Sequence, residues 1–485
     1  MIFLVLHRTN VGYIRLCTRF LVVALLILIY VPVFAAQVTF EPSLELSETY
    51  TDNVNRSKDL GEEDYITDVT PGFALQADGN RLSANLGFTV QNLFHVKDSS
   101  RNDQYHKLEA DASAELISDF AFLNLEARDS KQKTSPLGGI AQDNLNTADT
   151  AEVSVWTINP HFKKRFGGKA EGSASYSYKQ TQNDGLEVSN AETETVNIGL
   201  KSGPSLQRMT WSLDYSQKTI ERSETGNNSE ESSKAEAAYR VYEKLAVLFQ
   251  AGDERSDLST FQDGSYYALG ISMIPSSTLQ FDLYWGTRLE SASVSWAPTR
   301  RSALNLVLQR KKTGLNPGQV LTGTLQLKGR RVTWRAEYSE DEASDEEQLE
   351  NSLSGNSSSS ECSLSGGSFE RKRGEMDFGY KTVRSRVSTQ LYEERREFGV
   401  ENEKSSGSTV SWHWRLASRT TMLLDFHGSK EECFGNVLNS RNAEIGFSRK
   451  MGRAMEGHIK AQKKSGSGAR DYDENRFSVG VKWRF

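Results

Sequence analysis

The segment Tyr472–Phe485 alternates apolar and polar side chains, and this pattern restricts the fold more than any other feature of the chain. Its apolar positions are Phe477, Val479, Val481, Trp483 and Phe485. Side chains alternate between the two faces of a β-strand, so one face of this strand is apolar and the other is hydrated. An aromatic residue at the final position favours the closing strand of a membrane barrel, where aromatic residues lie at the interface. The alternative is an edge strand of a soluble sandwich.

Composition favours the barrel. The chain has 485 residues, of which 37% are hydrophobic, and only nine are proline. By length alone it would hold two or three soluble domains. One large barrel accounts better for a long and polar chain, because half of each strand faces water. The net charge of -6 is mild and indicates neither nucleic-acid binding nor a polybasic membrane patch.

The N-terminal region carries the one strongly apolar run, residues 20–31, preceded by three arginines. This run has the length of a signal-peptide core and is short for a spanning helix. Val33 and Ala35 suit positions −3 and −1 of a cleavage after Ala35. We therefore predict a signal peptide over residues 1–36 and a barrel over residues 37–485; a retained signal anchor is the alternative.

From residue 37 onward one unit repeats: an alternating strand, a short turn, a second strand and a longer polar connection. Strands at 65–77 and 82–96, for example, flank the hairpin turn at 78–80. The longer polar connections are expected at 131–148, 181–191, 221–232, 340–367 and 429–440. Roughly 24 strands follow from this count, within a range of about 22–26, and an even number places every short turn on one side.

The predicted fold class is all-β: a large transmembrane antiparallel β-barrel with short periplasmic turns and long extracellular loops. Closure removes the sheet edges, and lipid covers the one apolar face of each strand. The other face, as in Thr333-Trp334-Arg335-Ala336-Glu337, carries polar residues that would line a wet lumen. The mature chain enters its first strand at once, so no plug domain is expected.

No catalytic chemistry is indicated by the sequence, and neither a cofactor nor a metal is expected. H-E-x-x-H, C-x-x-C and G-x-S-x-G motifs are absent from the sequence. Asp425 and His427 come nearest to a catalytic pair, but two polar residues at this spacing on a lumen face are expected by chance. After export two cysteines remain, Cys362 and Cys433, which either form a disulfide or stay two separate thiols.

The segment Glu41–Asn53 resembles the mature N-terminus of the bacterial outer-membrane β-barrels associated with exosortase (PEP-CTERM sorting) and exopolysaccharide loci. Pro42, a following glutamate and the run Tyr50-Thr51-Asp52-Asn53 carry this resemblance. It implies a Gram-negative outer-membrane barrel that serves export or assembly of envelope material, most simply exopolysaccharide. The implied partners are the outer-membrane bilayer, the barrel-insertion machinery that reads the terminal strand, and polysaccharide-export components. A general diffusion porin and a structural or adhesive barrel without transport are the alternatives.

Overall fold

The computed structural model describes most of the chain from Gln37 to Phe485. Residues outside the description are 1–36, 59–60, 134–149, 185–189, 224–226, 258–262, 314–317, 345–367, 399–400, 434 and 469–470. The predicted signal peptide and Cys362 both fall outside the described residues. Within the described residues, no helix combines the length and the apolar character needed to cross a membrane.

The described chain forms 24 β-strands and one short 3-10 helix, η2 (Ser99–Arg101). The first twelve strands are β1 (Gln37–Thr51), β2 (Asp64–Asp78), β3 (Leu82–His95), β4 (Asp103–Ile117), β5 (Ala121–Lys133), β6 (Thr150–Phe166), β7 (Ala170–Asp184), β8 (Ala191–Ser202), β9 (Met209–Arg222), β10 (Asn228–Tyr242), β11 (Leu245–Ser256) and β12 (Gly264–Ser276). The remaining twelve are β13 (Leu279–Thr287), β14 (Leu289–Thr299), β15 (Ser302–Lys311), β16 (Gly318–Lys328), β17 (Val332–Ser344), β18 (Ser368–Lys381), β19 (Ser385–Phe398), β20 (Glu401–Ala417), β21 (Thr420–Cys433), β22 (Asn436–Lys450), β23 (Met455–Gly468) and β24 (Tyr472–Arg484).

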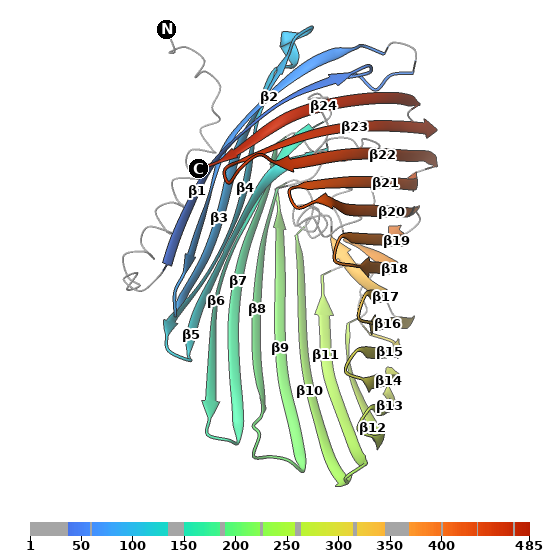
Figure 1. Cartoon of the computed structure of the whole chain (residues 1–485). Helices are drawn as coiled ribbons and strands as arrows, with labels where there is room; N and C mark the ends of the chain where they lie inside the picture. The colour runs from blue at the N-terminus through green and yellow to red at the C-terminus, as the bar shows by residue number, and fades with distance from the viewer. Residues whose placement is uncertain are drawn as a thin grey trace.

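The strands close into one barrel. Each pairs antiparallel with the next along the chain, and β24 pairs with β1 over the register Ser43–Thr51 with Arg476–Arg484. Figure 1 shows the result as a single curved wall in which red β24 has returned to blue β1. The strand number and the antiparallel closure confirm the sequence prediction, including the pairing of the last strand with the first.

The outer face of the wall is apolar, and the register explains why. Leu46 of β1 lies opposite Val69 of β2 and Val481 of β24, so apolar positions of neighbouring strands form continuous rows. Aromatic rings extend one such row, with Phe73 5.7 Å from Phe40 and 5.9 Å from Phe88 between ring centroids. Large exposed apolar side chains recur around the barrel in this way. In lipid, a β-protein can pair all of its backbone hydrogen-bonding groups only as a closed barrel, and its outer belt must be apolar. The fold is therefore of the outer-membrane type.

The two ends of the barrel differ in their connections. Short connections such as 79–81, 243–244 and 418–419 join even strands to odd strands at one end, which we call the turn end. The connections from odd to even strands lie at the other end, the loop end. Not all of these are long: Arg288 alone joins β13 to β14, with a positive φ of 59°. The expectation of long loops throughout one end is thus wrong at this hairpin.

The strands also extend farther toward the loop end than predicted. Predicted loops at 221–232 and 429–440 are mostly paired strand, since β21 continues to Cys433 and β22 begins at Asn436. Similarly, β7 reaches Asp184 and β17 reaches Ser344. In these segments both faces are polar because the strands have passed beyond the apolar belt. Backbone pairing continues there without the alternation of apolar and polar side chains that marks a strand in the sequence.

Candidate functional site: the lumen wall

The inner face of the barrel is polar, as the last strand illustrates. Its outward-facing Phe477, Val479 and Phe485 are 51%, 45% and 72% exposed. The inward-facing Glu474 and Arg476 of the same strand are buried. The predicted assembly-signal residues Phe477, Val479, Val481, Trp483 and Phe485 thus share the outer face, while their role in assembly stays a prediction. Alternation along the other strands likewise turns many polar side chains toward the lumen, together with some buried apolar ones such as Ile66 and Leu289.

Charge is distributed unevenly around this wall. Except for Lys107, the charged residues at inward positions of β1, β2 and β4 are carboxylates: Glu41, Glu45, Asp64, Asp68, Asp78, Asp103, Glu109, Asp111 and Glu115. Three of these, Glu41, Glu109 and Asp111, line a shallow cavity of about 290 Å³ on the inner side of β1–β4. We call this part of the wall the acidic arc.

On the opposite side of the 24-strand barrel from β1–β4, the strands β12–β16 form a part of the wall with few charges, which we call the neutral arc. Its inward positions hold neutral hydrogen-bonding side chains, interspersed with apolar ones such as Leu289, Val307 and Val320. The hydrogen-bonding residues are Gln280, Ser291, Ser293, Ser295, Asn305, Gln309, Thr322, Thr324 and Gln326. Asp282, Lys311 and Lys328 are the charged residues at described inward positions of this neutral arc. The lumen therefore has one strongly acidic side and one side that offers hydrogen bonds with little net charge.

The seam between the first and last strands is fastened at the loop end by a buried ion-pair network. Glu474 of β24, which is 0% exposed, accepts a hydrogen bond from Thr51 Oγ1 (2.9 Å) and pairs with Arg56 Nε (3.1 Å). Arg476, two residues along β24, also donates to Glu474. Two guanidinium groups thus share one carboxylate, and removing that carboxylate takes a close counter-charge from both buried arginines.

The residues that directly follow the first strand make further contacts with the last strand. Asn475 donates to Asp52 twice, from its backbone nitrogen and from Nδ2, at 2.7 Å each. Asn53 Nδ2 donates to the carbonyl oxygens of Asp473 (2.9 Å) and Ser57 (2.7 Å). Thr51, Asp52 and Asn53 belong to the run that carries the family resemblance. In the structure this run binds Asp473-Glu474-Asn475 of the last strand, and we call the two runs together with Arg56 and Arg476 the seam network.

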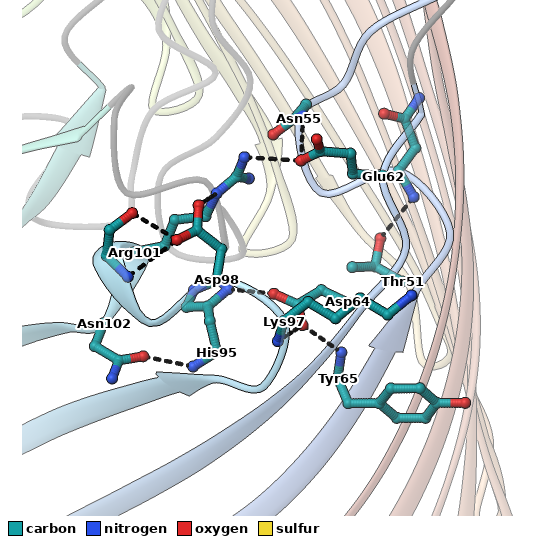
Figure 2. A network of polar contacts seen from close by, with 12 residues as sticks. Thr51, Asn55, Glu62, Asp64, Tyr65, His95, Lys97, Asp98, Arg101 and Asn102 are labelled. Carbon is teal, nitrogen blue, oxygen red and sulfur yellow. Dashed lines mark hydrogen bonds and ion pairs between the residues drawn. The ribbon is translucent and has the colours of Figure 1, made fainter.

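Two loop-end connections of the first hairpins are joined by a second polar network (Figure 2). The buried Asp64 carboxylate contacts His95 Nδ1 (2.8 Å) and accepts hydrogen bonds from the backbone nitrogens of Tyr65 (2.8 Å) and Lys97 (3.0 Å). Arg101 Nη2 reaches Glu62 at 3.0 Å from the adjacent connection. These contacts hold residues 61–63 against 96–102 at the mouth of the lumen.

Hydrogen bonds in these connections also lower the pKa values of two carboxyl groups. The ammonium of Lys97 donates to Glu63 and lowers the pKa of that carboxyl below its ordinary value of 4.5. The hydroxyl of Ser100 donates to Asp98 and lowers the pKa of that carboxyl below its ordinary value of 3.8. Both carboxylates are thus favoured in their charged form by the folded loops.

A row of ion pairs lines the inner wall on β17–β19. Arg371 binds Asp341 with two nitrogens, at 3.0 and 2.6 Å. Arg373 pairs with Glu394 at 3.1 Å, and Glu394 pairs in turn with Arg396 at 2.7 Å. Arg396 also lies 5.1 Å from the ring centroid of Phe369. This row crosses from β17 to β19 near the loop end and binds those strands to one another.

The structure does not join the two candidate dyad residues. Ser411 donates to Asp425, whereas His427 Nδ1 lies 3.0 Å from Thr409 Oγ1, so each contacts β20 and not the other. Among the described residues, no three His, Cys, Asp or Glu side chains converge as metal ligands would. Cys433 is buried and disulfide-bonded. Because Cys362 lies outside the described residues, its pairing with Cys433 stays a prediction.

Sequence reasoning misses the seam network and the ion-pair row. It places Asp341 and Glu342 in the polar loop 340–367, and it does not single out Glu474. The run Glu393-Glu394-Arg395-Arg396-Glu397 does contain a signal, since Glu394 and Arg396 alternate with residues of the other face. Which charges meet across strands depends on the register, which a single sequence does not specify.

No family model matches the chain, and no curated protein sequence is similar to it. Among solved structures, the FrpB iron transporter of Neisseria meningitidis aligns with 9% identity and a TM-score of 0.46, covering 92% of this chain and 82% of that one. A mutant of the ferric enterobactin receptor of Pseudomonas aeruginosa, in complex with enterobactin, aligns with 10% identity and a TM-score of 0.45, over 93% and 82% of the two chains. OmpT of Vibrio cholerae, with one loop deleted, aligns with 10% identity and a TM-score of 0.32, over 93% and 100%. Similarity at this level assigns no substrate or partner to this chain.

Proposed function

We propose that the barrel is a passive outer-membrane passage for hydrophilic envelope material, and that this material is an exopolysaccharide of an exosortase-type system. The observation that carries the proposal is the polar inner wall of a closed 24-strand barrel. Barrels of 16 or more strands are wide enough for an aqueous lumen or a plugged one. The cargo class comes from the resemblance of Glu41–Asn53 to exosortase-associated barrels. The turn end would face the periplasm and the loop end the exterior.

The distribution of charge supports a neutral or weakly charged polymer as cargo. Serine, threonine, asparagine and glutamine side chains of the neutral arc can exchange hydrogen bonds with sugar hydroxyls at little cost. The acidic arc would repel polyanions and attract cations instead. A polysaccharide would therefore slide along β12–β16 and interact only weakly with β1–β4. No catalytic residue is part of this proposal.

Conductance of the purified barrel in a planar bilayer tests the passage directly. We expect large open-channel currents that favour cations, because carboxylates dominate one side of the wall. A silent protein would support a structural or adhesive barrel instead. The matched variants Glu109→Gln and Asp111→Asn should reduce cation selectivity without closing the pore, and Gln309→Ala in the neutral arc serves as the control.

The cargo requires a separate measurement in cells. Deleting the gene should reduce secreted polysaccharide several-fold. If conductance is observed but secreted polysaccharide is unaffected, export is excluded and a general diffusion porin becomes the better description. Recovery of secretion by the wild-type gene, but not by a variant lacking Phe485, would link secretion to the assembled barrel.

A further inference from the structure

The wall is incomplete at one place, between β16 and β17. A short turn joins these strands, yet their register runs only from Lys328–Thr333 to Gly323–Tyr338. On its other side β16 is paired with β15 as far as Lys311–Gly318, and β17 is paired with β18 as far as Ser344–Ser368. Residues Gly318–Thr322 and Ser339–Ser344 therefore face each other as strands without forming rungs. We call this stretch the split seam.

A side chain occupies the place of the first missing hydrogen bond. Continuing the register would put Leu321 opposite Glu340, so that the amide of Leu321 would donate to the carbonyl oxygen of Glu340. Instead, Leu321 N donates to the carboxylate oxygen Oε2 of Glu340, at 3.0 Å. The other carboxylate oxygen accepts from Tyr338 Oη at 2.7 Å. A carboxylate oxygen thus takes the place of the backbone acceptor, and no rung forms at this position.

The two banks of the split seam are held independently. On one bank, the ion-pair row beginning at Asp341–Arg371 ties β17 to β18 and onward to β19. On the other bank, β15 and β16 are fully paired. Among the described residues, no ion pair joins β16 to β17. Separation of the banks would therefore break the hydrogen bond between Leu321 and Glu340 and leave the pairing of β15 with β16 and of β17 with β18 intact.

The split seam lies at the rim of the apolar belt. Leu308 and Leu321, 40% and 41% exposed, form the last apolar rung of the outer face, and the next outward rung is Arg310–Gln319. Toward the lumen the same stretch presents Thr322 and Asp341 by alternation. An opening here connects a polar lumen with the level where acyl chains meet their headgroups. Unpaired backbone groups are also tolerable at this level, because water reaches it.

We propose that the split seam is a lateral portal between the lumen and the outer membrane, held closed by Glu340. The molecule that it fits is amphipathic: its polar part stays with the hydrogen-bonding neutral arc while its acyl chains pass between β16 and β17 into the bilayer. This goes beyond passage through the length of the barrel, and it does not depend on which polymer, if any, the lumen conducts.

Two disulfide variants measure the separation of the strands. Val320→Cys with Asp341→Cys would be directly opposite each other if the register continued. Thr324→Cys with Glu337→Cys is the matched control on the same strands and the same inner face, where the rung is formed. Both pairs occupy the same position in the alternation of rungs. Under mild oxidation we expect the control pair to cross-link several-fold faster, as judged by peptide mapping. Equal rates would show a continuous ladder and overturn the portal.

Lipid access is measured with a photoreactive side chain. Benzoylphenylalanine replaces either Val320 at the split seam or Val307, which faces the lumen from β15, where both edges are paired. The two proteins are placed in phosphatidylcholine vesicles and irradiated, and bound lipid is quantified by mass spectrometry. We expect several-fold more lipid at position 320. Equal capture at both positions, or none at either, contradicts the portal. Neither result bears on conductance, so the proposed function is tested separately.

Discussion

Two pairs of neighbouring strands in the barrel are unusual. The pair that is far apart in the sequence is held together more firmly than the pair that a short turn connects. β1 and β24 are separated by almost the whole chain, yet a buried network fastens their loop ends, with Glu474 bound by Thr51, Arg56 and Arg476. β16 and β17 are joined by a short turn, yet their loop ends are unpaired beyond Gly323–Tyr338. Proximity in sequence therefore starts a pairing but does not ensure that it continues.

The two seams show that side chains at the ends of neighbouring strands can either extend or interrupt the pairing of the backbones. At the closing seam, β1 and β24 are paired through their backbones up to Thr51–Arg476, and buried ion pairs and hydrogen bonds continue the contact beyond the last rung. At the split seam, one partly exposed carboxylate replaces a backbone acceptor. Buried ion pairs are expensive to break by removing one partner, whereas an exposed hydrogen bond is worth little. The two seams should consequently respond to single substitutions by very different amounts.

The largest effect is expected from Glu474→Ala at the closing seam. Removing this carboxylate leaves the buried Arg56 and Arg476 without it, which should cost about 3–5 kcal/mol of stability. The midpoint of urea unfolding, read from the mobility shift of unboiled samples on gels, measures the loss. Glu456→Ala, a half-buried inward glutamate of the adjacent strand, is the control and should change the midpoint little. A similar shift in both variants would show that the seam network has no special role.

Deleting Phe485 should affect assembly more than equilibrium stability. Phe485 N donates to the carbonyl oxygen of Pro42 at 2.9 Å and so extends the closing seam by one contact. If the insertion machinery reads the terminal aromatic residue, the deletion should lower the amount of heat-modifiable barrel in the outer membrane several-fold. Removal of residues 258–262, between β11 and β12, should lower it much less. Equal yields from both deletions would count against an assembly signal.

Glu340→Ala should have a smaller and strictly local effect. Loss of the hydrogen bond to Leu321 should cost about 0.5–1.5 kcal/mol and speed amide exchange in Gly318–Thr322. Glu340→Gln keeps an acceptor and should exchange at nearly the wild-type rate. Hydrogen exchange followed by mass spectrometry compares these peptides with the paired segment Ser429–Cys433. Protection of Gly318–Thr322 as strong as that of Ser429–Cys433 in the wild type would remove the distinction between the seams.

The smallest effect is that of pH on the loop end beside the closing seam. The pKa values of Glu63 and Asp98 are lowered by Lys97 and Ser100, so their contribution is complete above the ordinary values of 4.5 and 3.8. It is lost as the pH falls through the lower, folded-state values. Proteolysis in the connection 52–63 should therefore increase modestly below about pH 4. A Lys97→Met variant should show weaker dependence on pH, and an unchanged profile would mean that the Glu63 contact is unimportant.

Much of the architecture could be predicted from the alternation of side chains. A short turn is predicted wherever one alternating strand ends and the next begins, as at 78–80, and the structure has the connection 79–81 there. Counting these turns predicts the 24 strands. The prediction is wrong where the strands leave the apolar belt. Ser429–Cys433 pairs with Asn436–Asn439 and adjacent residues, although neither segment alternates in polarity. Backbone hydrogen bonding there is independent of side-chain polarity, so the alternation of side chains does not predict these strand ends.

The sequence by itself determined that the chain is a closed barrel with an apolar outer face and a polar inner one, because a period of two in side-chain polarity has that consequence for a strand in lipid. It also singled out Tyr50-Thr51-Asp52-Asn53 and the last strand as notable segments. The sequence also predicted that the last strand pairs with the first. Only the tertiary structure decided that Thr51 and Asp52 bind Glu474 and Asn475 through side chains, and that the pairing of β16 with β17 stops at Gly323–Tyr338. Both outcomes depend on which residues lie opposite each other across the strands, and the cross-strand register is a property of the closed sheet as a whole.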